Sequence, residues 1–119
     1  KVKLLGTGKP MREFIHADDL ANAIYTCLKV NKNILKNKFK SKLPILNVGT
    51  KQQISIKNLS KLIAKYINFN GKITFDKNFP DGTFKKNLDS NKINKLGWYP
   101  EINFKEGLKK VIMGRKVKF

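Results

Sequence analysis

The chain has 119 residues, with 26 lysine or arginine residues against 8 aspartate or glutamate residues and a formal net charge of +18. This length allows one domain of ordinary size or a portion of a larger one. The 40% hydrophobic content is enough for a packed core, which excludes a wholly disordered chain. No apolar run approaches the ~20 residues of a membrane-spanning helix, so no membrane partner is expected.

The basic charge has two possible explanations. A strongly basic chain is typical of proteins that bind nucleic acid, and a small nucleic-acid-binding module is one hypothesis. However, only Arg12 and Arg115 are arginine, whereas dedicated binders use arginine for bidentate and stacked contacts. Lysine, asparagine and isoleucine share AT-rich codons, and we favour this codon bias as the source of the lysine, with no nucleic-acid partner.

The cysteine and histidine counts limit the chemistry. Cys27 and His16 are the only residues of their kinds, which excludes an internal disulfide and a multi-cysteine zinc site. No metal site is therefore expected, and a reducing, cytoplasmic setting is the default. The opening residues 1–5 resemble a strand already under way, so we expect the chain to be part of a longer protein.

Two short strands are predicted at the start of the chain, at residues 1–5 and 12–16. The glycine turn Gly6-Thr7-Gly8 separates them. A dinucleotide-binding fingerprint would need a third glycine and a following helix. Both are missing, so the sequence predicts a structural turn.

An amphipathic helix is predicted at residues 19–30, with Asp18 or Asp19 as its N-cap. Cys27 lies on its apolar face and is interpreted as an inert core residue. Residues 31–43 are predicted to form a solvated surface loop.

The second half of the chain continues the alternation of strands and helices. The expected elements are a short buried strand at 45–48, a helix capped by Ser55, a strand at 73–75, a short helix from Ser90 through Leu96 closed by Gly97, and a last helix from the capping box Asn103–Glu106. Helices that alternate with short strands indicate an α/β or α+β fold, and we predict the α/β class.

Arg12 is the most informative candidate for a binding residue. In a chain that uses lysine almost everywhere, this arginine follows a glycine turn at the start of a strand. Its planar guanidinium offers two parallel donors to a phosphate or carboxylate. The alternative is a structural ion pair. No catalytic residue is expected, since no serine lies in a nucleophile-elbow context and His16 is interpreted as a structural hydrogen-bonding residue.

The loop from Asp81 to Lys86 is a second candidate. Asp81 could accept hydrogen bonds from a hydroxyl or a ring N–H, and Lys85 or Lys86 could face a phosphate. The alternatives are that Asp81 only forms a turn and that the lysines are solvated surface charge.

A set of motifs in a fixed order resembles a known family. The stretch GTGKPMREFIHADDLA at residues 6–21 is followed by the matching segments Leu46–Thr50, Phe75-Asp76, Pro80–Thr83, Lys86, Leu88-Asp89 and Leu96–Trp98. Together they resemble the GDP-L-fucose synthases, which are extended short-chain dehydrogenase/reductases. The resemblance covers nearly the whole chain and is weakest in 31–43 and after 112.

Enzymes of that family convert GDP-4-keto-6-deoxymannose to GDP-L-fucose by two epimerisations and a reduction with NADPH, and are commonly homodimers. The resemblance implies that residues 1–119 are the C-terminal substrate-binding portion. It also implies that the NADP-binding Rossmann domain and the Ser-Tyr-Lys catalytic set lie upstream, so this portion alone would be inactive. Another nucleotide-sugar epimerase or dehydratase of the same superfamily is the alternative.

The resemblance also implies roles for four residues. Arg12 would bind the GDP-sugar at its diphosphate, Asp81 would contact the substrate from the DG turn, and Lys86 would lie near the phosphates. Leu5 stands where the family often has a substrate-contacting tryptophan. Leucine keeps the apolar contact but lacks the indole N–H donor.

Overall fold

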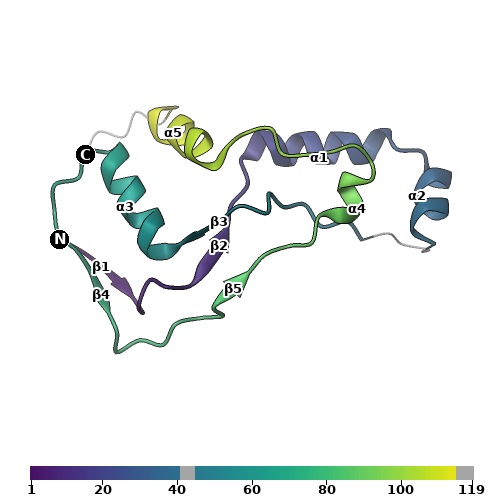
Figure 1. Cartoon of the computed structure of the whole chain (residues 1–119). Helices are drawn as coiled ribbons and strands as arrows, with labels where there is room; N and C mark the ends of the chain where they lie inside the picture. Colours follow the sequence, from purple (N-terminus) through teal and green to yellow (C-terminus); the bar gives the residue numbers. More distant parts are fainter. Residues whose placement is uncertain (41–44, 115–119) are drawn as a thin grey trace.

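The computed structural model describes residues 1–40 and 45–114. Its elements in chain order are β1 (Val2–Leu5), β2 (Met11–Glu13), α1 (Ala17–Lys29), α2 (Lys32–Phe39), β3 (Gln53–Ser55), α3 (Ile56–Tyr66), β4 (Ile73–Asp76), β5 (Lys85–Lys86), α4 (Asn91–Asn94) and α5 (Phe104–Gly114) (Figure 1). The predicted α/β class is confirmed. Within these described ranges, no helix has the length and apolar character needed to cross a membrane.

The strands form two small sheets. β1 pairs with β4 in parallel, and β2 is the centre of a three-stranded sheet with the order β3-β2-β5. β2 runs antiparallel to β3 and parallel to β5, so Arg12 pairs with Ile54 on one side and with Lys86 on the other. The central strand thus places Arg12 between two neighbouring strands that lie far away in sequence.

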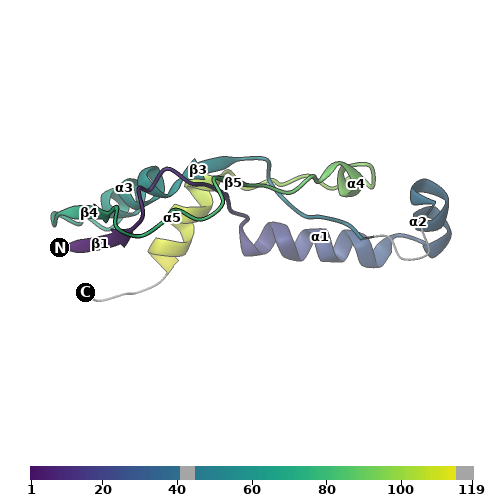
Figure 2. The ribbon, with the colours of Figure 1, turned by 90° about the horizontal axis from the view of Figure 1, so that it is seen from below.

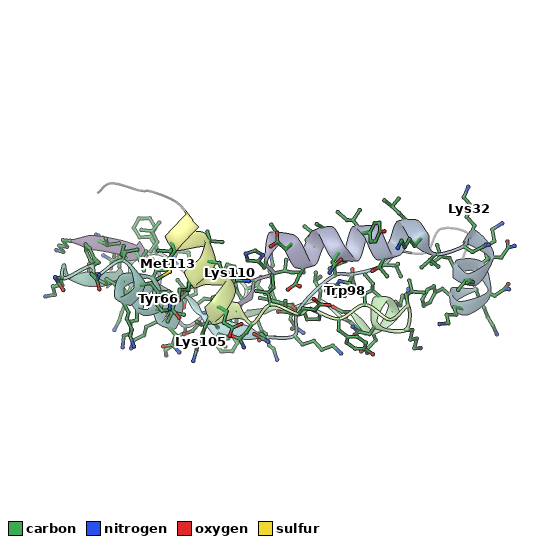
Figure 3. The ribbon with its side chains drawn as sticks, turned by 90° about the horizontal axis from the view of Figure 1, so that it is seen from above. Lys32, Tyr66, Trp98, Lys105, Lys110 and Met113 are labelled. Atoms are coloured by element: carbon green, nitrogen blue, oxygen red, sulfur yellow. The ribbon has the colours of Figure 1, made fainter. Side chains whose placement is uncertain are left out.

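The molecule is a thin slab with a small core. Its extents are 55 × 34 × 16 Å and its radius of gyration is 18.0 Å, against about 13.5 Å for a compact domain of this length. Figure 2 shows the helices and sheets spread along the long axis of this slab. Among the residues that the structure describes, the buried hydrophobic cluster consists of Ala23, Ile93 and Trp98, and Figure 3 shows Trp98 between α1 and α4. Cys27 packs against this cluster, and burial raises the pKa of its thiol, as expected for an inert residue.

The N-cap of α1 differs from the prediction. His16 is the cap, because its Nδ1 accepts a hydrogen bond from the backbone N–H of Asp18 at 3.2 Å. Asp19, one of the two predicted caps, is only 2% exposed. Its carboxylate accepts hydrogen bonds from the backbone N–H groups of Glu101 (3.0 Å) and Ile102 (3.1 Å). It therefore attaches the segment before α5 to the first turn of α1.

The surface loop predicted at 31–43 is wrong over most of its length, because residues 32–39 form α2. Asn31 caps this helix by accepting a hydrogen bond from the backbone N–H of Asn33 at 2.8 Å. Lys40, with φ of 46°, ends the helix in a left-handed conformation. Lysine has a good helix propensity, so high charge was a poor indicator of irregular structure here. Residues 41–43 of the predicted loop lie outside the described residues.

The buried strand predicted at 45–48 is also wrong, since β3 lies at 53–55 instead. Instead of the hydrogen-bond ladder of a strand, residues 47–49 make isolated hydrogen bonds to the segment before α4. The side-chain amide of Asn47 donates to the backbone carbonyl of Asp89 at 3.3 Å. The Ser90 hydroxyl donates to the backbone carbonyl of Gly49 at 3.1 Å.

Several local predictions are confirmed, and one cap is not. The Ser55 hydroxyl accepts from the Asn58 N–H at 3.1 Å and caps α3, and Gly97 has a positive φ of 91° after α4. Ser90 makes no side-chain cap, because its hydroxyl is fully buried and directed to Gly49. The Asp89 carboxylate accepts from the N–H of Asn91 instead.

Candidate functional site

Arg12 presents an unneutralised positive charge. Its Nη1 donates to the backbone carbonyls of Met11 (2.6 Å) and Thr83 (2.8 Å). In residues 1–40 and 45–114, no carboxylate lies within the 4.0 Å salt-bridge distance of the guanidinium. Nη2 and Nε make no hydrogen bond to these residues either, so they are available to an anion. The alternative of a structural ion pair does not hold for the described parts of the chain.

Lys86 lies beside Arg12 in the sheet. The two residues are direct partners of the parallel β2–β5 pair, which places their side chains on the same face of neighbouring strands about 4.8 Å apart. Both line a cavity of about 600 Å³, together with Lys85. Like charges that face each other across strands destabilise a sheet unless an anion lies between them, so this wall of the cavity suits a phosphate group.

A second cavity adjoins the first at Arg12. It has a volume of about 150 Å³ and is lined by Arg12, Leu5, Asp81 and the turn residue Gly82, among others. Leu5 is 62% exposed and offers an apolar surface to this cavity. The structure therefore brings the four predicted site residues to two cavities that share Arg12, with Lys86 in the larger and Leu5 and Asp81 in the smaller.

Asp81 is held by the glycine turn. The backbone N–H of Thr7 donates to its Oδ1 at 2.7 Å, and the Thr7 hydroxyl donates to its Oδ2. These hydrogen bonds from Thr7 hold the pKa of the Asp81 carboxyl below its ordinary value. Asp81 thus attaches the 80–83 loop to the first turn, while Arg12 attaches the same loop at Thr83. Asp81 therefore has the turn-forming role that was considered for it, and the 80–83 loop that it holds forms part of the wall of the smaller cavity.

The Asp81 hydrogen bonds make stability depend on pH in the acid range. A lowered pKa in the folded state stabilises the protein above the unfolded pKa of about 3.9, and this stabilisation is lost as pH falls through the folded pKa. We expect Asp81→Asn to lower the melting temperature at pH 7. The difference from the unchanged protein should shrink between about pH 5 and pH 2. Differential scanning calorimetry across this range measures it, and a pH-independent difference would contradict the role of the ionised carboxylate.

Glu13 was missed by the sequence reasoning. Its Oε1 accepts hydrogen bonds from the backbone N–H of Lys51 at 2.6 Å and from the hydroxyl of Thr50 at 3.5 Å. Its Oε2 accepts from the backbone N–H of Leu88 at 2.9 Å. Glu13 also lines the larger cavity. The available signal was an acidic residue directly after Arg12 in a chain with only 8 of them, but its partners could not be read from the sequence.

The glycine turn does not form a cofactor site. It leads into β2, where a dinucleotide-binding loop would lead into a helix. A methyl group on Gly8 would lie within 3.0 Å of three ring atoms of Phe75, so a side chain of the chain itself fills the space that a phosphate would need. The interpretation as a structural turn is confirmed, and these residues do not fit NADP. His16 is used in the α1 cap, as its predicted hydrogen-bonding role requires.

Known proteins match this chain in sequence and in structure. Residues 1–49 match a family model described as the NAD dependent epimerase/dehydratase family. A probable GDP-L-fucose synthase 1 from Oryza sativa subsp. japonica is 41% identical over 108 residues, which are 91% of this chain and 30% of that protein. The GDP-L-fucose synthase of Escherichia coli (strain K12) is 38% identical over 107 residues, which are 90% of this chain and 33% of that protein.

Solved structures are also similar to this chain. The crystal structure of a GDP-6-OMe-4-keto-L-xylo-heptose reductase from C. jejuni has a TM-score of 0.82 to this chain at 38% identity, and the match covers 94% of this chain and 32% of that one. The family resemblance drawn from the motifs is confirmed by these matches. The chain spans about a third of the length of the curated relatives.

Proposed function

We propose, from the premise that the chain belongs to the NAD dependent epimerase/dehydratase family, that it forms the GDP-sugar-binding portion of an NADPH-dependent GDP-L-fucose synthase. The observation that carries this proposal is the pair of cations on one sheet face, Arg12 and Lys86, at the wall of a cavity. The names of the relatives at 38–41% identity support GDP-L-fucose synthase as the parent enzyme.

The free nitrogens of Arg12 would bind the diphosphate of GDP in this arrangement. A planar guanidinium with Nη2 and Nε available can donate two parallel hydrogen bonds to phosphate oxygens. Lys86 would add a second positive charge from the neighbouring strand. The smaller cavity beyond Arg12, with Leu5 and Asp81 at its wall, would contact another part of the same substrate.

The chemical role of this portion would be to position the sugar. Binding energy from the GDP part of GDP-4-keto-6-deoxymannose helps to hold the reacting hexose in a productive geometry. NADPH supplies the hydride of a reduction when it is bound to such an enzyme. We propose that its site and the catalytic residues belong to a part of the enzyme outside residues 1–119. A cytoplasmic location and a homodimer of the whole enzyme stay predictions.

Lys86 should contribute less than Arg12 because its side chain is solvent-exposed. We expect Lys86→Ala to weaken GDP binding about 3- to 10-fold at low ionic strength, and less at 0.5 M salt, where exposed charges are screened. Titration calorimetry with GDP at two salt concentrations checks this. A loss of affinity that salt leaves unchanged would contradict a charge-based role.

The proposed function is tested on the full-length protein as the cell makes it. We expect binding of GDP in preference to UDP, and conversion of GDP-4-keto-6-deoxymannose to GDP-L-fucose with oxidation of NADPH. Turnover of a UDP-sugar instead would assign another epimerase or dehydratase of the superfamily. Oligonucleotide binding with a steep salt dependence, together with no affinity for GDP, would support the nucleic-acid hypothesis.

A further inference from the structure

We infer that Glu13 is a positioning residue of the proposed diphosphate site, where it holds the two loops that form the walls of the larger cavity. The inference rests on the proposed function. It concerns a residue that would act through the loops and not through direct contact with the substrate.

The hydrogen bonds of Glu13 join three segments at the cavity. One carboxylate oxygen accepts a hydrogen bond from the backbone N–H of Lys51, in the loop before β3. The other accepts from the backbone N–H of Leu88, in the loop that follows β5. Gly49 and Leu88 line the same cavity as Arg12. A methyl group on Gly49 would lie 2.6 Å from Oε1 of Glu13, so the loop approaches the carboxylate closely. Glu13 thus fixes both loops to the strand that carries Arg12.

The position of Lys86 depends on this attachment. β5 contains only two residues, Lys85 and Lys86. The residue before it is held to β2 by a hydrogen bond from the backbone N–H of Met11 to the carbonyl of Phe84 at 2.7 Å, so the segment also needs an attachment on its other side. The hydrogen bond from Leu88 to Glu13 comes two residues after Lys86 and extends the attachment of this segment to β2. Removal of the carboxylate would therefore let Lys86 move away from Arg12.

Electrostatics alone gives the opposite expectation for this residue. A carboxylate at the wall of an anion-binding cavity repels a diphosphate, so its neutralisation should strengthen GDP binding. A positioning role predicts weaker binding, because the loops lose the acceptor that fixes them. The sign of the change in affinity therefore distinguishes the two.

Asp19 provides a matched control. Its carboxylate also accepts two backbone N–H groups from a distant segment, those of Glu101 and Ile102, and it is almost fully buried. It does not line the larger cavity. Asp19→Asn should thus disturb the fold in the same way as Glu13→Gln without a direct effect on the GDP site.

The experiment measures GDP affinity and melting temperature for the full-length protein and for Glu13→Gln, Glu13→Asp and Asp19→Asn. Glutamine keeps the length but places an NH₂ donor against one backbone N–H. Aspartate keeps the charge but is one methylene shorter and cannot reach both loops. We expect both Glu13 variants to bind GDP about 3- to 10-fold more weakly, and Asp19→Asn to stay within about two-fold of the unchanged protein.

The possible results separate this inference from the proposed function. GDP binding that is unchanged or stronger in Glu13→Gln would overturn the positioning role and leave the proposed function standing. An equal loss of affinity in Asp19→Asn would also overturn it, because the effect would then follow stability alone. If Glu13→Gln does not fold, Glu13→Asp decides by the same criterion. No GDP binding by the unchanged protein would overturn the proposed function and this inference with it.

Discussion

Replacement of Arg12 by alanine is expected to weaken GDP binding about 30- to 1000-fold, which corresponds to about 2–4 kcal/mol. Arg12 has no carboxylate partner in the described ranges, so a diphosphate would be its main ionic contact. Loss of the guanidinium would leave that diphosphate without a charge-assisted bidentate partner. Titration calorimetry on the full-length protein measures the change, and binding of NADPH should be retained.

Arg12→Lys is the informative companion variant, because it keeps the charge and removes the planar fork. The lysine ammonium has three donors, but it is a compact point charge and cannot reproduce the two parallel hydrogen bonds that the planar guanidinium offers to phosphate oxygens. Its affinity for GDP should therefore fall between those of the unchanged protein and Arg12→Ala. If Arg12→Ala binds GDP with unchanged affinity and melts at an unchanged temperature, Arg12 is not part of the GDP site.

The features that the sequence predicted well depend on residues that are close together in the chain. The Ser55 cap needs only Asn58, three residues away. The left-handed Gly97 follows directly from its place after a short helix. The Gly6–Gly8 turn was likewise recognised from its own residues. Signals of this kind are local, because backbone geometry is decided within one turn of chain.

The features that could not be predicted depend on distant contacts. Glu13 is separated from Lys51 by 38 residues and from Leu88 by 75, and nothing near Glu13 indicates either partner. β5 has only two lysines, and it is a strand only because β2 lies beside it. The mainly apolar segment 45–48 suggested a strand by composition, yet it joins neither of the two sheets formed by the described residues. Tertiary context decided these three outcomes.

Gly8→Ala is expected to destabilise the fold by about 2–5 kcal/mol, for two separable reasons. Gly8 has a φ of +73°, and a left-handed conformation costs an L-residue about 1–2 kcal/mol. The added methyl group would also lie within 3.0 Å of three ring atoms of Phe75, and such overpacking costs about 1–3 kcal/mol. The free energy of unfolding, from urea denaturation followed by circular dichroism, measures the sum.

Gly97→Ala isolates the first of these two costs. Gly97 has a φ of +91°, and apart from Gly97 and its two chain neighbours, no atom of the residues that the structure describes lies within 4 Å of the position that a methyl group would take. Its substitution should cost only the backbone term, about 1–2 kcal/mol. The excess loss in Gly8→Ala then measures how tightly the turn packs on Phe75 of β4. Gly8 lines the smaller cavity beside Arg12, so the packing of the turn on Phe75 also sets the shape of the proposed site. Equal losses of unfolding free energy in Gly8→Ala and Gly97→Ala would show that the contact with Phe75 does not constrain the turn.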